Sequence, residues 1–463
     1  MNSGRKIHFE ISERKILLRI FDVFFVLILL HLLGSIFDFH YFKISTTNFY
    51  WTLVLSLYIS FFGTVFEMYN LQIASNQFQI TKSVVLASTS TVLVYLLTPF
   101  FTPALPENRL QILLFYLAIL SALLLWRFLY VKFFASTRFL KSVILVCEND
   151  ELQELVKGLQ SVDPHYKIVG YVNSGVKDVN SSLKSIKSIS LGKIEEFIIK
   201  NNVSEIVIAS QKTEGITVDL YNKLIRLLEN GLIVREYTQV YESITQRIPV
   251  QYVARDFYKY FPFSRSNHNQ LYLMLVRIVE ILFVLSGLLV GLVVLPFILI
   301  GNAIGNRGPL FYTQERVGRN GDVFKIYKLR SMVTNAESGG AVFATVNDSR
   351  ITPFGKFLRK SRLDEFPQFI NVLKGDMAVI GPRPERPVFV KEIAEIMPFY
   401  QTRHVVKPGL TGWAQVNYSY GETIEDSLIK LQYDLYYIKH RSVFLDLSIT
   451  VKTISTVLFY RGQ

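Results

Sequence analysis

Residues 271–301 read LYLMLVRIVEILFVLSGLLVGLVVLPFILIG, and this apolar stretch decides how the rest of the chain is arranged. From Ile281 to Ile300 it carries no charged residue, and about 20 such residues suffice for a helix to cross a bilayer. Pro296 interrupts the stretch, and a proline inside a helix removes a backbone hydrogen bond and clashes with the preceding turn. The pattern therefore leaves two arrangements open, a spanning helix or a helix that enters one leaflet, bends near Pro296 and returns.

Two adjacent carboxylates, Asp364 and Glu365, lie downstream, within RKSRLDEFPQFINVLKGDM at residues 359–377 and ahead of Gly381-Pro-Arg-Pro384. An Asp-Glu pair is by itself most often a surface feature. Neighbouring side chains on a helix point about 100° apart, however, so two carboxylates can do different work at one phosphate. An ionised aspartate can attack phosphorus, and a nearby glutamate can help to hold Mg²⁺. We therefore expect Asp364 to be a nucleophile and both carboxylates to be Mg²⁺ ligands.

Cations surround this pair. From residue 301 onward the chain has 22 Lys and Arg against 15 Asp and Glu, so this region is basic. Cations close to Asp364 would keep its carboxylate ionised and attract a pyrophosphate. The alternative is a solvated basic helix face paired with acids. The cations within two helical turns are Lys356, Arg359, Lys360 and Arg362.

The amino-terminal part contains four apolar runs of about 20 residues, each long enough to cross a bilayer. We expect a four-helix transmembrane bundle over residues 16–135, preceded by a cytoplasmic tail over residues 1–15. Cations lie before the first run and after the fourth, so both ends of the bundle should be cytoplasmic. Few ionisable residues fall inside the runs, which favours an anchor and a dimerisation surface over a transport pathway. The runs are residues 20–37, 49–66, 83–105 and 110–131.

Residues 140–240 alternate buried strands with helices, which predicts a doubly wound parallel sheet of the Rossmann-like, CoA-binding-like kind. The turn after the first strand, Glu148-Asn-Asp-Glu151, lacks the glycines that let a backbone approach a pyrophosphate. A structural or regulatory role is therefore favoured over dinucleotide binding. Residues 241–270 are irregular and aromatic, and we interpret them as a linker rather than an interfacial belt.

Composition limits the partners. The formal net charge is +13, and the basic segments lie beside apolar ones. This pattern favours anionic lipid headgroups and anionic substrates over nucleic acid. The single cysteine, Cys147, excludes a disulfide framework within the chain and offers no zinc-ligand cluster.

Three stretches carry a resemblance to a known family: GPLFYTQERVGRNGDVFKIYKLRSM, LRKSRLDEFPQFINVLKGDMAVIGPRPERP and HVVKPGLTGWAQV. With them, residues 271–463 resemble the catalytic domain of the bacterial sugar transferases, the monotopic phosphoglycosyl transferases. Residues 16–240 are similar to the four-helix bundle and Rossmann-like domain of the large members that initiate exopolysaccharide synthesis. The resemblance implies a mainly α catalytic domain over residues 306–463, on the cytoplasmic face of a bacterial inner membrane.

The resemblance also implies a reaction. Asp364 would attack the β-phosphate of a UDP-sugar, release UMP and pass the phosphosugar to polyprenyl (undecaprenyl) phosphate, with Mg²⁺ as cofactor. By family analogy Arg383 of the Pro-Arg-Pro turn contacts phosphate. Local charge adds Arg359 and Arg362, while Arg330 and Arg316 could bind the pyrophosphate or simply support the fold. Cytoplasmic chemistry of this kind decides for a re-entrant membrane helix over residues 271–305, bent at Pro296.

The chain departs from the family pattern in its membrane helix. The usual Lys-Arg-x-x-Asp is Val276-Arg-Ile-Val-Glu280 here, and Leu295 replaces the usual small residue before the proline. Two other functions remain open. One is a degenerate membrane scaffold, against which the intact Asp-Glu pair and Pro-Arg-Pro turn argue. The other is a membrane nucleotide-sugar dehydratase, which would need a glycine-rich cofactor loop and a Tyr-x-x-x-Lys pair.

Overall fold

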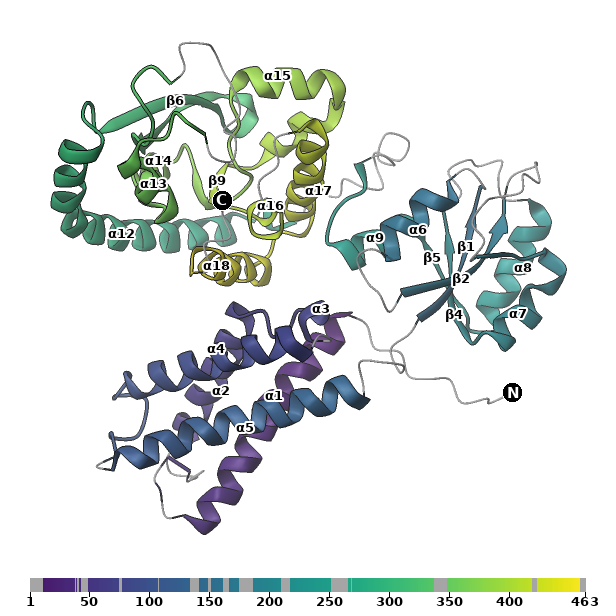
Figure 1. Ribbon diagram of the computed structural model, residues 1–463. Coiled ribbons are helices and arrows are strands. Elements are labelled where there is room, and N and C mark those ends of the chain that lie inside the picture. The colour runs from purple at the N-terminus through teal and green to yellow at the C-terminus, as the bar shows by residue number, and fades with distance from the viewer. Residues whose placement is uncertain are drawn as a thin grey trace. The chain divides into compact units, whose positions relative to one another are not determined.

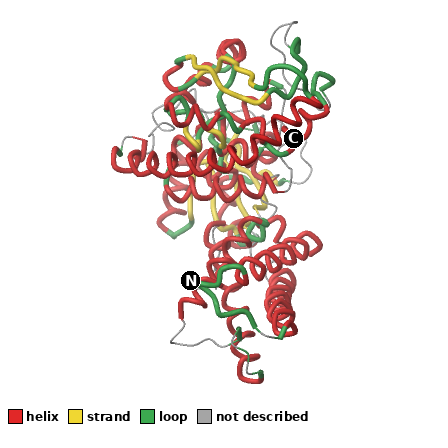
Figure 2. Tube along the Cα trace, turned by 90° about the vertical axis from the view of Figure 1, so that its left-hand side faces the viewer, coloured by secondary structure: helices red, strands yellow, loops and turns green. Residues whose placement is uncertain are grey.

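The computed structural model describes residues 11–37, 39, 41–42, 49–74, 77–106, 108–133, 141–148, 151–160, 166–174, 186–209, 217–250, 265–267, 269–336, 348–418 and 423–458. The chain divides into two compact units, Met1–Thr245 and Gln246–Gln463. Helices, red in Figure 2, make up most of the described chain. Most of the predicted tail, and half of the predicted linker (residues 251–264 and 268), fall outside the described residues.

The first unit begins with apolar helices that pack side by side (Figure 1), in which α2 and α5 each contact both α1 and α4. Two of them, α1 and α5, are long and apolar enough to cross a membrane, and α2 is apolar but has 17 residues. All four predicted runs fall on helices. The third run differs most, because its helix ends at Leu96 and the chain continues into Pro99, whose ring disfavours helical conformation in the preceding residue. The helices are α1 Ile11–Ile36, α2 Phe49–Val65, α3 Leu71–Ala74, α4 Gln77–Leu96 and α5 Arg109–Phe133.

A five-stranded sheet follows in the same unit, with the order β3-β2-β1-β4-β5 and every pair parallel. In Figure 1, α6 and α9 lie on one side of this sheet and α7 and α8 on the other. This is the parallel arrangement that the alternation of strands and helices predicts. Its elements are β1 Lys141–Cys147, α6 Leu152–Gln160, β2 Tyr166–Asn173, β3 Lys187–Ser188, α7 Ile194–Lys200, β4 Val203–Ile208, α8 Val218–Glu229, β5 Ile233–Glu236 and α9 Tyr237–Thr245.

The second unit is mainly helical, as predicted, with one antiparallel hairpin and one short parallel pair of strands. Its largest core joins α15, η6 and α17, where Phe389, Tyr400 and Leu435 are buried together. The elements are α12 Gln270–Gly305, β6 Phe311–Val317, β7 Val323–Leu329, α13 Pro353–Lys360, η5 Leu363–Glu365, α14 Gln368–Lys374, β8 Ala378–Ile380, α15 Pro387–Ile396, η6 Pro398–Val405, β9 Gly409–Thr411, α16 Trp413–Asn417, α17 Ile424–His440 and α18 Val443–Leu458.

The apolar helix α12 has 36 residues and contains Pro296. Figure 1 shows it changing direction in its last part, before the chain enters β6. The parts of α12 before and after Pro296, its two arms, both pack on the rest of the second unit. Val284, before the proline, is buried against α14 and β7, and Ile298, beyond it, is buried against β7 and α13. Most of its other large apolar side chains are exposed, and it is the most apolar of the candidate membrane helices.

Charged residues attach the start of α12 to the rest of the unit. Arg277 donates to the carbonyl oxygens of Val372 and Leu373, at 2.7 and 3.0 Å, and so caps the carboxyl end of α14. Glu280 accepts a hydrogen bond from the backbone N–H of Val379 at 2.9 Å. The Arg-x-x-Glu sequence that departs from the family pattern therefore joins α12 to α14 and β8.

Candidate active site

Asp364 lies on the short helix η5, in the connection between α13 and α14. The α13 helix begins at the cap residue Thr352, whose hydroxyl accepts from the N–H of Gly355. It ends before Arg362, whose φ of 59° lies in the left-handed region. This conformation is uncommon for a residue with a side chain and turns the chain into the short helix η5. On this short helix Asp364 is 8% exposed.

Glu365 lies among three cations. Arg383 donates a hydrogen bond to its Oε1 at 3.1 Å, and the Lys328 Nζ lies 3.6 Å from the same oxygen. Arg362 is 3.9 Å from the other oxygen. Burial alone would raise the pKa of Glu365, but these cations outweigh it and lower the pKa to about 2. Glu365 is therefore ionised at neutral pH.

Asp364 has the opposite electrostatic balance. Burial, followed by the negative charge of Glu365, raises the pKa of Asp364, while Lys328, Arg359 and Arg362 act in the other direction. Its Oδ1 atom is buried and accepts no hydrogen bond from the described residues. A carboxylate oxygen with no partner and reduced solvation is suited to nucleophilic attack, because it need not give up a hydrogen bond first.

The Pro-Arg-Pro turn is held by contacts along its whole length. The N–H of Gly381 donates to the backbone carbonyl of Thr411 on β9, and the N–H of Gly409 donates to the carbonyl of Pro382. Arg403 donates to the carbonyl of Arg383 at 2.8 Å. A Cβ atom on Gly381 would lie 2.4 Å from the carbonyl oxygen of Lys407, so only glycine fits there. The turn thus presents the Arg383 side chain to Glu365 from a rigid backbone.

Lys328 is the residue that the sequence analysis missed. It lies on β7, on the same strand face as the buried Ile326, because side chains alternate between the faces of a strand. The sequence signal that could have found it is a lysine two residues after a core residue in a predicted strand, since both side chains then lie on the same face. The β7 strand is itself attached to α14 by Asn371, which accepts from the N–H of Tyr327 at 3.1 Å and donates to the carbonyl of Lys325 at 2.8 Å.

The other predicted arginines divide by their contacts. Arg362 faces Glu365, and Arg359 donates to the hydroxyl of Ser331 at 2.9 Å while acting on the Asp364 charge. Arg330 is buried and donates to three backbone carbonyls, those of Asn306, Pro309 and Met332. These contacts favour the alternative in which Arg330 supports the fold.

Arg316 also contacts the Pro-Arg-Pro segment. It donates to the carbonyl of Pro384 at 3.1 Å and lies 3.4 Å from a carboxylate oxygen of Glu385. It therefore supports the turn that carries Arg383, and it remains a candidate for contact with a pyrophosphate.

The side chains of Asp364 and Glu365 could bind Mg²⁺ only together with a substrate. Within the described residues there is no group of three or more His, Cys, Asp or Glu that could hold a metal alone. Asp364 and Glu365 are the paired carboxylates, and Oδ1 of Asp364 has no partner among the described residues. Mg²⁺ is commonly held by one or two carboxylates plus substrate phosphates, so the pair fits that role.

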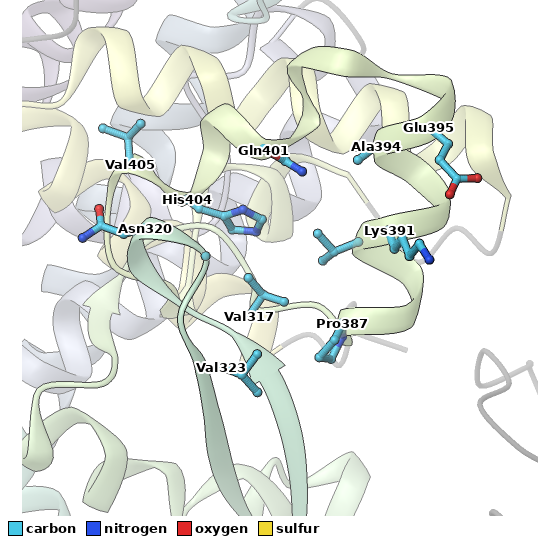
Figure 3. Close-up of a pocket in the computed structure, with 12 residues that line it drawn as sticks. Val317, Asn320, Val323, Pro387, Lys391, Ala394, Glu395, Gln401, His404 and Val405 are labelled. Carbon is cyan, nitrogen blue, oxygen red and sulfur yellow. The ribbon is translucent and has the colours of Figure 1, made fainter.

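A pocket of about 630 Å³ lies elsewhere in the second unit, between the tip of the β6–β7 hairpin, α15 and η6 (Figure 3). Its wall includes Val317, Pro387, Lys391 and His404, but none of Asp364, Glu365 and Arg383. Burial, followed by the charge of Arg403, lowers the pKa of His404 to about 4, so this imidazole is neutral at pH 7. The pocket and the carboxylate pair are therefore distinct features.

Comparisons with known proteins place this unit among transferases. Residues 271–460 match the family described as bacterial sugar transferase. The UDP-N-acetylgalactosamine-undecaprenyl-phosphate N-acetylgalactosaminephosphotransferase of Aeromonas hydrophila is 52% identical over 151 residues, covering 33% of this chain and 36% of that protein. The UDP-glucose:undecaprenyl-phosphate glucose-1-phosphate transferase of Xanthomonas campestris pv. campestris is 46% identical over 164 residues, covering 35% of this chain and 34% of that protein. The matched part thus spans about a third of these two relatives.

A third relative matches over a longer region. The galactosyl transferase CpsE of Streptococcus agalactiae serotype III is 30% identical over 355 residues, covering 73% of this chain and 75% of that protein. This match is longer than the second unit, so it also includes part of the first unit.

Proposed function

Because this chain belongs to the bacterial sugar transferase family, we propose that it transfers a sugar-1-phosphate from a UDP-sugar to polyprenyl (undecaprenyl) phosphate. The observation that carries the proposal is the buried Asp364, whose Oδ1 has no partner among the described residues, beside an ionised Glu365 and several cations. The relatives' names include undecaprenyl-phosphate phosphotransferases. The product would be the first lipid-linked unit of an exopolysaccharide or related glycan.

The first step is attack of an Asp364 carboxylate oxygen on the β-phosphorus of the UDP-sugar. The new bond joins that oxygen to phosphorus, and the bond from phosphorus to the oxygen bridging the two phosphates breaks, so that UMP leaves. An acyl phosphate carrying the sugar remains on Asp364. Cations near the pair, Lys328 and Arg383 first, would stabilise the charge on the phosphate oxygens as the bond forms.

The second step returns Asp364 to its carboxylate form. A phosphate oxygen of polyprenyl phosphate attacks the same phosphorus, and the bond between phosphorus and Asp364 breaks. The product is a polyprenyl-diphosphate-sugar, and the two steps require ping-pong kinetics. Asp364 and Glu365 would hold Mg²⁺ together with the substrate phosphates, where the ion would neutralise phosphate charge.

The two arms of α12 support a re-entrant arrangement. Both pack on the second unit, before and after Pro296, while their outer faces expose large apolar side chains. A helix that crossed the bilayer would put its ends about 30 Å apart on opposite sides, where one folded unit could not contact both. We therefore assign α12 to one leaflet of the bacterial inner membrane, with the catalytic unit on the cytoplasmic face.

The first unit would serve as the membrane anchor and as the surface of a homodimer. Its parallel sheet, with strands on both sides of β1, is compatible with a Rossmann-like domain. The described turn residues after β1, Glu148 and Glu151, supply no glycines for a pyrophosphate. We assign this domain a structural or regulatory role.

The function is tested with membranes that contain the full chain. Incubation with a panel of UDP-sugars, Mg²⁺ and polyprenyl phosphate should release UMP with at least one sugar. Asp364→Asn should abolish that release, whereas Asp322→Asn, which changes an exposed carboxylate at the hairpin tip, should preserve it. With labelled UDP-sugar and no acceptor, the label should stay on the wild-type chain. UMP release at the native rate from the Asp364 variant would overturn the nucleophile assignment.

A further inference from the structure

A buried ion pair lies behind the Pro-Arg-Pro turn. The guanidinium of Arg403, on η6, lies 2.8 Å from the Oδ2 of Asp434, on α17. Arg403 is 5% exposed and Asp434 is 1% exposed. Burying both charges is unfavourable unless they pair and form further hydrogen bonds. Such a pair therefore calls for a reason beyond general stability.

The remaining contacts of Arg403 lead toward the carboxylate pair. Its Nη1 donates to the hydroxyl of the buried Tyr400 at 2.6 Å. Its Nη2 donates to the backbone carbonyl of Arg383 at 2.8 Å. The side chain of Arg383 in turn donates to Glu365 at 3.1 Å. A continuous series of polar contacts thus runs from Asp434 through Arg403 and Arg383 to Glu365.

The pKa shifts of Asp434 and Arg403 agree with a guanidinium that is held in place. Burial raises the pKa of Asp434 to about 6 despite the neighbouring Arg403. Burial opposes the charge of Arg403, but Tyr400 and Asp434 outweigh it and raise the pKa of this guanidinium. Arg403 therefore stays charged, and it offers a charge-assisted hydrogen bond to the Arg383 carbonyl.

We propose that Asp434 and Arg403 are positioning residues for the proposed transfer reaction. They hold the peptide of Arg383, between its two prolines, so that the Arg383 guanidinium reaches Glu365 and the substrate phosphate. Neither residue needs to touch the substrate. The inference rests on the proposed function, but the position of the turn can also be tested without any activity.

A double-mutant cycle tests the coupling. The initial rate of UMP release is measured for the wild type, Asp434→Asn, Arg383→Ala and the double variant. Asp434→Asn alone should lower the rate by about 10-fold or more, and by less than about 2-fold when Arg383 is already alanine, because residues that act through one another are non-additive. Equal losses in both backgrounds, or no loss in the wild-type background, would overturn the proposal.

Hydrogen exchange of the full chain gives the readout that needs no activity. Asp434→Asn should speed amide exchange in the peptide that covers residues 381–386. Thr423→Ala, which removes the cap of the same helix α17, should speed exchange near its own position only, and its effect on the rate should be equal in both Arg383 backgrounds. Unchanged exchange at residues 381–386 in Asp434→Asn would refute the inference, even if no UDP-sugar gave UMP.

A milder variant covers the case in which Asp434→Asn does not fold. Tyr400→Phe removes only the hydroxyl that accepts from Arg403. It should change the exchange and the UMP release in the same direction by a smaller factor. A folded Tyr400→Phe chain with wild-type values of both would count against the proposal. Wild-type membranes that release no UMP, together with faster exchange in the variant, would contradict the proposed function and leave the positioning inference supported.

Discussion

The ring of Phe366 occupies the space that a side chain at Gly291 would need. A Cβ atom built on Gly291 would lie 2.0 Å from Cε1 of Phe366, and one on Gly287 would lie 2.3 Å from the ring of Phe369. Phe366 follows the Asp364-Glu365 pair directly in the chain. The apolar helix α12 is therefore in contact with the segment that carries the proposed nucleophile, and its glycines make that contact possible.

Gly291→Val is expected to reduce UMP release by about 10-fold or more. The new side chain must displace Phe366, and a shift of about 1 Å at a catalytic group is enough for a loss of that order. The measurement is the initial rate at saturating UDP-sugar, with membrane association followed by fractionation.

Two further variants make this prediction specific. Leu292→Val changes the neighbouring exposed position and should keep the wild-type rate. Combining Gly291→Ala with Phe366→Leu should recover part of the rate that Gly291→Ala alone loses, because leucine lacks the edge of the ring. Full activity of Gly291→Val would show that contact with α12 does not set the position of Asp364.

Lys328→Met is expected to move the acid limb of the pH–rate profile to higher pH. Asp364 must be ionised to attack, and its pKa is raised, first by burial and then by Glu365. Lys328 acts in the opposite direction, so removing its charge raises that pKa further and leaves less carboxylate at a given acid pH. The acid limb of kcat/KM for UMP release reports this ionisation in the free enzyme.

The matched control is Lys356→Met, which removes an exposed cation of the same basic region. Its acid limb should coincide with that of the wild type. An acid limb that moved to lower pH in Lys328→Met would contradict the electrostatic role given to this lysine.

The ends of α12 should both be accessible from the cytoplasm. Single cysteines are introduced at Gln270 and at Arg307, both exposed, in a chain in which Cys147 is replaced by alanine. A membrane-impermeant thiol reagent should label both in inverted vesicles and neither in intact cells. A cysteine at Phe100, which is exposed between α4 and α5, should show the reverse pattern, since the positive-inside rule predicts that loop on the outside. Labelling of the two α12 ends from opposite sides would establish a spanning helix.

Asn371→Ala is expected to lower the free energy of unfolding by about 2 kcal/mol or more. Asn371 is fully buried and bonds both the N–H of Tyr327 and the carbonyl of Lys325, and an unpaired buried polar group costs about 1–3 kcal/mol. Thermal unfolding in detergent measures the effect. Gln401→Ala, at an exposed position, should leave the midpoint unchanged, and an equal midpoint for Asn371→Ala would show that α14 does not depend on this contact.

Much of the architecture can be predicted from local sequence patterns. Apolar runs locate helices, and the alternation in residues 140–240 locates a parallel sheet, because burial follows the period of each element. The third apolar run shows where this reasoning weakens. Its helix ends before Pro99, although apolar residues continue beyond it. Hydropathy alone does not register how a proline restricts the residue before it.

The sequence by itself determined the Asp364-Glu365 pair, its basic surroundings and the interruption at Pro296, because these features are local in the chain. Only the tertiary structure decided which cations lie beside the pair. Lys328 lies beside it from β7, whereas Arg330, two residues further on, donates to backbone carbonyls. Arg403, from η6, donates to the carbonyl of Arg383, and Asp434, from α17, pairs with Arg403. Partners of this kind depend on how distant segments pack, and packing is a property of the folded chain rather than of any short stretch of it.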